Sequence, residues 1–312
     1  MRPPADVRPS PLAGGWYPAD PRELATTVDG HLSAARPPAA AGAVVALVAP
    51  HAGHRYSGPV AGYAFGTTRQ LTPDLVAIVG PMHDPFDGAL LTSGHRAYAT
   101  PLGDVPIDPD VVRRLDVHVR DELGFGLIPV RNDREHSLEI ELPFLQRALP
   151  KAFRLVPVMV RDQRREVARG LGRALARTLE DHSALLIAST DLSHYYPQPR
   201  AEKFDAELLR RLEAFDPDAV LRAEEEGRGF ACGIGALAAV LWAARELGAD
   251  RLEVLRYATS GDATGDYAQV VGYAAAVVTR GGAGDSSPPA RLIAGRGRRH
   301  SRSAPARTPR TR

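Results

Sequence analysis

The stretch VVALVAPHAGHRYSG (residues 44–58) joins an apolar run to a histidine and a turn. Residues 44–50 are almost all apolar and rich in β-branched side chains, which is typical of a buried strand. His51 follows directly, and a helical pattern begins after a turn of small residues, at Gly58. Open α/β sheets bind their ligands at the carboxyl ends of the strands. This stretch therefore predicts a core strand that delivers His51 to a binding site.

Two later stretches repeat this arrangement. LVAIVGPMH (75–83) ends at His83, and ALLIASTDLSH (184–194) places Asp191 and His194 just after its apolar residues. Because the carboxyl ends of parallel strands meet at one edge of a sheet, we expect these side chains to lie close together.

The remaining pattern predicts the fold class. Apolar strands alternate with helical segments, and no Pro/Ser-rich linker divides the middle of the chain. This alternation favours a single α/β domain over residues 1–280, with a central sheet core and helices on both of its faces. The expected helices are 21–35, 58–71, 108–123, 135–149, 164–179, 201–215, 218–225 and 231–247.

Composition limits the setting and the partners. The single cysteine, Cys232, excludes an internal disulfide framework and fits a reducing compartment. The longest uncharged apolar run, 230–244, is shorter than the ~20 residues that cross a bilayer. The N-terminus lacks the apolar stretch of a signal peptide. We therefore expect a cytoplasmic protein with no membrane partner.

The C-terminal residues 281–312 differ in charge from the rest. They contain eight Arg and one Asp, whereas residues 1–280 contain 31 basic and 36 acidic side chains. The Gly/Ser/Pro/Arg-rich composition predicts a disordered basic tail. Such a tail is either a solvated extension without a role or the one place where nucleic acid or an acidic surface would bind.

His51 and His83 are candidate metal ligands, because neutral imidazole is the commonest metal-binding side chain. A single histidine beside a turn is more often only hydrogen-bonded, but two at matched strand ends favour a shared site. His54 lies inside the turn, and we expect it to support the site from behind or to face solvent.

Cys232 is the third candidate ligand. It is expected in the first turn of the apolar helix 231–247, where the helix N-terminus would lower the thiol pKa and favour the metal-binding thiolate. The alternative is inert packing, which is common for a buried cysteine. Three ligands so far apart in the chain lack zinc-finger spacing, and they would leave positions open for water, substrate or dioxygen.

Asp191 and His194 are spaced to act as an acid/base pair at the same site. The chain has no G-x-S-x-G elbow, which disfavours serine hydrolysis. Glu135 opens the predicted helix 135–149 and suits its dipole. His136 has two interpretations that stay open: it directs substrate or water, or it only begins a helix near the sheet edge.

Eight motifs, in order, carry a family resemblance. They are PHAGxxYSG (50–58), GPxH (80–83), TPLG (100–103), EHSLE (135–139), LPFL (142–145), SxDLSH (189–194), ACG (231–233), and SGD (260–262) near VGYA (271–274). Over residues 14–278 the chain resembles the Memo family, known in prokaryotes as AmmeMemoRadiSam system protein B.

The resemblance implies a fold similar to that of class III extradiol-type non-haem iron dioxygenases. It also implies one metal ion, iron or copper, at His51, His83 and Cys232, with Asp191 and His194 in the same pocket. The dioxygenases use two histidines and a carboxylate. A thiolate in place of the carboxylate favours copper(I) as well as iron.

Our main hypothesis is therefore a metal-dependent, dioxygenase-like redox protein acting on an unidentified small molecule or peptide. Asp191 and His194 would handle protons or orient a dioxygen-derived ligand. The alternative is a non-catalytic binding or adaptor protein with a vestigial dioxygenase-type pocket, because the resemblance extends to animal relatives implicated in phosphopeptide binding. Zinc-assisted hydrolysis ranks third. The prokaryotic family name implies a radical SAM partner protein.

Overall fold

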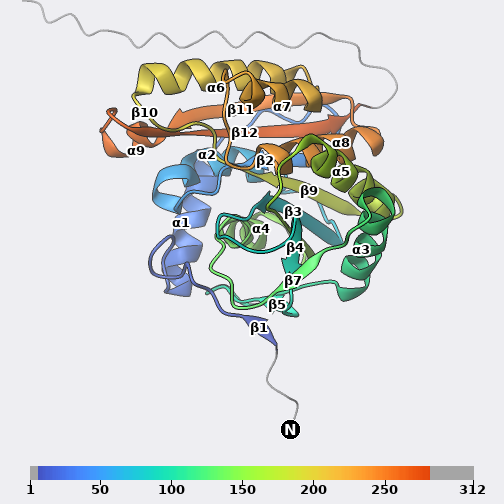
Figure 1. The fold of residues 1–312 in the computed structure, drawn as a ribbon. Coiled ribbons are helices and arrows are strands. Elements are labelled where there is room, and N and C mark those ends of the chain that lie inside the picture. The colour runs from blue at the N-terminus through green and yellow to red at the C-terminus, as the bar shows by residue number, and fades with distance from the viewer. Residues whose placement is uncertain (1–5, 282–312) are drawn as a thin grey trace, which may run out of the picture. The chain divides into compact units, whose positions relative to one another are not determined.

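Four parallel strands form the centre of the main sheet (Figure 1). The computed structural model describes residues 6–281, so the predicted tail from residue 282 onward lies outside the described residues. The central strands are β2 (Ala43–Ala49), β9 (Ala184–Ser189), β3 (Leu75–Pro81) and β8 (Arg154–Val160), in the spatial order β2-β9-β3-β8. This order places β9 between the two strands that end near His51 and His83.

Antiparallel pairing extends the sheet on both sides. Next to β2 lies β12 (Val270–Arg280), which also pairs with β10 (His194–Tyr196) and β11 (Arg251–Thr259). Next to β8 lies β4 (Leu90–Ser93), followed by β7 (Ile128–Val130). The sheet is therefore mixed, and the predicted α/β class is confirmed.

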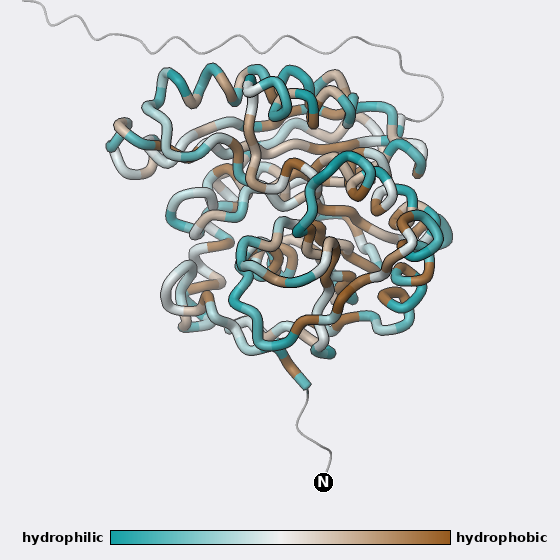
Figure 2. The backbone as a smooth tube through the Cα atoms, viewed as in Figure 1, coloured by the Kyte–Doolittle hydropathy of each residue, from teal (hydrophilic) through white to brown (hydrophobic). Residues whose placement is uncertain are grey.

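Helices cover both faces of this sheet (Figure 1). In β3, Ala77 and Val79 belong to one apolar cluster while Val76 and Ile78 belong to the other, as the two-residue period of a strand requires. Figure 2 shows the resulting hydrophobic interior. One face is packed by α3 (Pro109–Leu123), α5 (Arg165–Leu179), α6 (Gln198–Glu213), α7 (Pro217–Glu225) and α8 (Ile234–Glu246), the other by α1 (Pro21–Ala34), α2 (His54–Gly66) and α4 (Leu142–Ala148). None of the helices in residues 6–281 is long and apolar enough to cross a membrane.

Capping residues explain the helix starts that were predicted well. Asp20 accepts hydrogen bonds from the backbone N–H groups of the first turn of α1, and Pro21 occupies the first helical position. Asp108 and Pro109 begin α3 in the same way. These caps satisfy backbone donors that a helix leaves unpaired at its N-terminus.

Helix starts near the candidate site residues differ from the prediction. α2 begins at His54 rather than Gly58, and α8 begins at Ile234, so Cys232 precedes the helix. The predicted helix 135–149 starts too early: residues 135–138 are not helical, because the Glu135 carboxylate binds the next two backbone N–H groups and forms a local turn instead. Only the 3₁₀ turn Glu139–Glu141 and α4 are helical there.

Arg8 links the N-terminal strand to residues 133–139, the segment that contains the turn at Glu135. The strand β1 (Val7–Arg8) belongs to a small sheet with β5 (Ala97–Tyr98) and β6 (Val105–Pro106). Arg8 is 1% exposed and forms ion pairs with Asp133 at 2.8 Å and Glu139 at 2.5 Å. It also donates to the backbone carbonyl of Glu135 at 2.7 Å. One buried guanidinium therefore fixes the segment 133–139 through three contacts, with Asp133, Glu135 and Glu139.

We predict that Arg8→Ala destabilises the protein by about 3–5 kcal/mol, because it leaves two buried carboxylates without their partner. Urea denaturation measures this loss. Arg147→Ala is the control, since Arg147 pairs with Asp29 at the surface and such pairs contribute about 0–1 kcal/mol. Equal effects of the two substitutions would contradict a structural role for the Arg8 cluster.

Candidate metal centre

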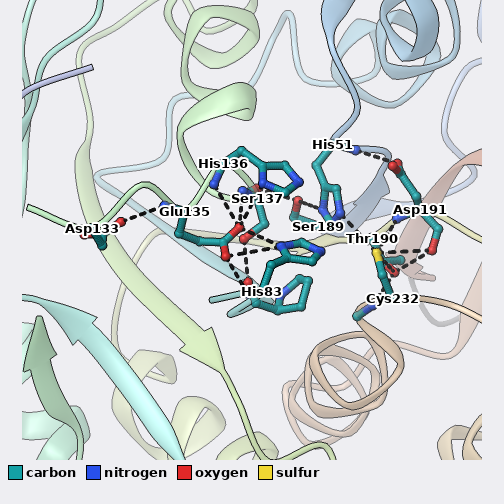
Figure 3. A network of polar contacts seen from close by, with 12 residues as sticks. His51, His83, Asp133, Glu135, His136, Ser137, Ser189, Thr190, Asp191 and Cys232 are labelled. Carbon is teal, nitrogen blue, oxygen red and sulfur yellow. Dashed lines mark hydrogen bonds and ion pairs between the residues drawn. The ribbon is translucent and has the colours of Figure 1, made fainter. Parts of the chain in front are cut away.

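The carboxyl ends of β2, β9 and β3 bring three predicted site residues together (Figure 3). His51 follows β2, His83 follows β3 and Asp191 follows β9. The backbone N–H of His51 donates to the Asp191 carboxylate at 2.8 Å. The strand order places these exits side by side, as the repeated strand-then-polar pattern predicted.

A triad of histidines forms the centre of the site. His51, His83 and His136 each offer a ring nitrogen, and these atoms all lie within 4.8 Å of one another. The His83 and His136 rings stack at 4.3 Å, and the His51 ring meets each of them edge-on. This triad could hold a metal ion. His136 comes from the turn after Glu135, so its functional interpretation, which the sequence left open, gains support.

Glu135 organises two of these histidines. Its carboxylate accepts from the His83 ring Nδ1 at 2.9 Å, from the His83 backbone N–H at 2.6 Å, and from the His136 and Ser137 N–H groups at 2.8 Å each. Burial alone would raise the pKa of Glu135, but the hydrogen bonds from His83 and the electrostatic effect of the His83 and His136 rings lower it well below its usual value. The ionised carboxylate therefore holds the His83 proton on Nδ1 and leaves Nε2 free for a metal.

The sequence did not reveal this role of Glu135. It suggested a helix dipole contact, because Glu135 was expected to open the predicted helix 135–149. The available signal was the direct adjacency of Glu135, His136 and Ser137 within one motif. A carboxylate that binds the next two N–H groups is a turn-forming arrangement.

Cys232 lies beside His51. Its Sγ atom is 3.0 Å from the His51 Nε2 and 3.3 Å from the backbone nitrogen of Asp191, which donates to it. The predicted low-pKa thiolate is wrong for this structure. Desolvation of the sulfur and the nearby Asp191 carboxyl raise the pKa of Cys232, and the helix that was expected to lower it begins only at Ile234.

The three histidines of the triad, Asp191 and Cys232 line one pocket of about 400 Å³. The other lining residues are Trp16, Ala52, His194, Tyr195, Val271 and Tyr273. Trp16 is 38% exposed and its ring lies 4.4 Å from that of His136. The neighbouring Tyr17 is buried and donates to Glu139 at 2.6 Å. The N-terminal aromatic pair thus has one ring in the core and one at the pocket.

Asp191 and His194 both face this pocket, and their protonation suits proton transfer. Burial raises the pKa of Asp191 to about 7, and the N–H of His51 offsets this only in part. Burial lowers the pKa of His194, and its Nδ1–H donates to the carbonyl of Leu192 at 2.8 Å. The Nε2 of a neutral His194 is therefore free to accept a proton.

His54 lies behind the pocket and does not line it. It is buried in the first turn of α2, where its Nε2 donates to the carbonyl of Ile140 at 3.0 Å. Its backbone N–H donates to the carbonyl of Trp16 at 2.9 Å. His54 therefore supports the Trp16 segment. Of its two expected positions, supporting the site or facing solvent, the structure shows the first.

Fold and pocket together define a single α/β unit with a histidine-rich centre at the carboxyl edge of its parallel strands. Residues 8–277 match the family model described as Memo-like protein. The chain belongs to this family. It is 38% identical over 286 residues to a MEMO1 family protein of Methanopyrus kandleri, covering 86% of this chain and 98% of the relative.

Other relatives match over the same share of the chain. MEMO1 family proteins of Nitrosopumilus maritimus and Aeropyrum pernix are 32% and 35% identical, each again covering 86% of this chain and 98% of the relative. The crystal structure of an uncharacterized protein from Escherichia coli K12 aligns with a TM-score of 0.47 and 15% identity, covering 76% of this chain and 99% of its own. That likeness defines neither a site nor an activity.

We predict that metal binding at pH 8 releases about one proton through Cys232, because a thiol must lose its proton to bind a metal. Affinity should therefore increase with pH. At pH 8 Asp191, with a pKa of about 7, is already mostly ionised, and His136, whose pKa burial lowers to about 4, is already neutral. Calorimetry in buffers of different ionisation enthalpy counts the protons. Cys232→Ser should release clearly fewer, and equal release would place the thiol outside the metal's ligands.

Proposed function

We propose that this protein binds one iron or copper ion and performs dioxygenase-like redox chemistry on a small molecule or peptide. One observation supports it most: three imidazole nitrogens lie within 4.8 Å of one another in a pocket of about 400 Å³, and the Cys232 sulfur lies 3.0 Å from one of them. Donors drawn from distant segments leave room for a substrate, as catalytic metal sites do.

The donor set fits this proposal. Imidazole suits iron, copper and zinc, and a thiolate favours the softer ions among them, including copper(I). We assign His51, His83 and Cys232 as the ligands. His136 is close enough to replace or join them, and its stacking against His83 keeps its ring at the centre. The bound ion would supply the capacity to exchange electrons with substrate or dioxygen.

The other side chains would supply proton transfer and binding. His194 presents a free Nε2 that takes a proton, and Asp191, with a pKa of about 7, is present in both protonation states near neutrality. Trp16 lies against His136 and lines the pocket, where it would contact a bound substrate.

A second candidate function is ligand binding without turnover, as in an adaptor protein. Its support is the exposure of Trp16 and Tyr195, which are 38% and 69% exposed and both line the pocket. Tyr195 is also held with a φ of 62°, an uncommon conformation for a non-glycine residue that often marks ligand contacts. Aromatic rings of this kind suit a peptide.

The radical SAM partner protein that the family resemblance implies remains a prediction.

We predict near-stoichiometric iron or copper in protein purified without oxygen and without an affinity tag. His51→Ala and Cys232→Ala should each lose most of it, because each removes one of only three assigned ligands. Elemental analysis measures the content. His118→Ala is the matched control, since His118 hydrogen-bonds Thr178 outside the site and should retain the metal.

The remaining outcomes separate the candidates. Equal metal in the parent and in Cys232→Ala would overturn the ligand assignment. Zinc as the native ion would favour hydrolysis over redox chemistry. Metal without oxygen consumption on any aromatic diol, combined with tight peptide binding, would favour the adaptor function.

A further inference from the structure

The hydroxyl of Ser189 has three polar neighbours and only one proton to share. Ser189 is fully buried at the end of β9. Its Oγ lies 3.0 Å from the Nδ1 of His51, 2.5 Å from the backbone carbonyl of Ser137 and 2.9 Å from the Oε1 of Glu141. Glu141 is 1% exposed and does not line the pocket. Figure 3 shows Ser189 beside the His51 ring, joined to it by a dashed line.

Counting protons leaves one arrangement that satisfies all three contacts. A carbonyl oxygen can only accept, so the hydroxyl proton of Ser189 goes to Ser137. The two remaining lone pairs of the hydroxyl oxygen then face His51 and Glu141, and both of these groups must donate. An ionised carboxylate has no proton to donate. Each alternative leaves two oxygen lone pairs, or a nitrogen and an oxygen lone pair, facing each other in a buried site, which is costly.

The surroundings of Glu141 agree with this count. Burial raises the pKa of Glu141 well above its usual value, and the nearby Asp191 carboxyl acts in the same direction, while the contact with Ser189 opposes them. No Lys or Arg is among its hydrogen-bond or ion-pair partners in residues 6–281. A neutral carboxylic acid is the form that a buried site without a cation favours.

We propose that Glu141 is a positioning residue of the metal centre: as a neutral acid it donates to Ser189, and Ser189 holds His51 as the tautomer with its proton on Nδ1. The Nε2 lone pair of His51 then faces Cys232 and would be available to a bound ion. This proposal rests on the proposed metal function, but the tautomer and the neutral carboxyl are properties of the metal-free protein.

Two buried carboxyl groups thus position two ligand histidines in different ways. Glu135 is ionised and binds His83 directly, whereas Glu141 is neutral and acts on His51 through a hydroxyl. These two carboxyl–histidine pairs therefore orient two ligands while adding only one fixed negative charge between them. Outer groups of this kind set ligand orientation and metal affinity.

The first test uses metal-free protein at neutral pH. Nitrogen NMR of the histidine rings should show His51 with its proton on Nδ1 in the parent and in Glu141→Gln, because the amide of Gln also donates. The infrared spectrum of the parent minus that of Glu141→Gln should contain the C=O band of a neutral carboxylic acid. A carboxylate band there instead would overturn the proposal.

The second test measures metal affinity with iron(II) and copper(I) added alone. Ser189→Ala should weaken binding by about 10–100-fold, the range for outer-shell partners of ligand histidines. Glu141→Met, which cannot donate, should weaken it in the same direction, and Glu141→Gln should stay within about twofold of the parent. Thr92→Val is the matched control, because it removes a buried hydroxyl from β4, away from the pocket.

These outcomes separate the two proposals. If Glu141→Gln loses as much affinity as Glu141→Met, the carboxyl group does not act as a neutral donor. If neither loses any, Glu141 has no positioning role. If the parent itself binds neither ion, the metal function fails, while the NMR and infrared results still test the state of Glu141.

Discussion

The parallel pairing of β9 with β2 on one side and with β3 on the other is the constraint on which the site depends. It aligns the carboxyl ends of these strands, so the residues that follow them must share one edge. His51 and His83 then lie close enough for their rings to meet at 5.3 Å. Neither residue could be moved to another strand end without separating this pair. The helices on both faces maintain the register by burying the alternating side chains of the same strands.

Buried polar groups position the site residues that do not follow a strand of the main sheet. Arg8 anchors the segment 133–139 through Asp133 and Glu139, and that segment supplies Glu135 and His136 to the site. Charges this deeply buried are tolerated only when they are paired or strongly hydrogen-bonded. The polar network around Arg8 therefore does more than stabilise the fold. It sets the positions of His83 and His136 through the segment that carries Glu135.

The sequence predicted the parts of the structure that depend on short-range patterns. Apolar strands ending in His51, His83 and Asp191 were visible as runs followed by polar residues, and the starts of α1 and α3 were predicted to within one residue. The role of Glu135 was not visible, because its bonds to the two following N–H groups replace the start of the predicted helix 135–149. The raised pKa of Cys232 was also hidden, since desolvation depends on segments far away in the chain. The donation from Glu141 to Ser189 could not be predicted either, because it follows from three contacts of Ser189 with residues far away in the chain.

The ligand set is the central claim, and X-ray absorption at the metal edge tests it most directly. Protein loaded with iron(II) or copper(I) without oxygen should show one sulfur scatterer and at least two imidazole nitrogens in the inner shell. The sulfur should disappear in Cys232→Ala while imidazole scattering remains. A shell of nitrogen and oxygen alone in the parent would contradict the account, because it would leave Cys232 outside the centre and the histidines as the only protein ligands supported by their geometry.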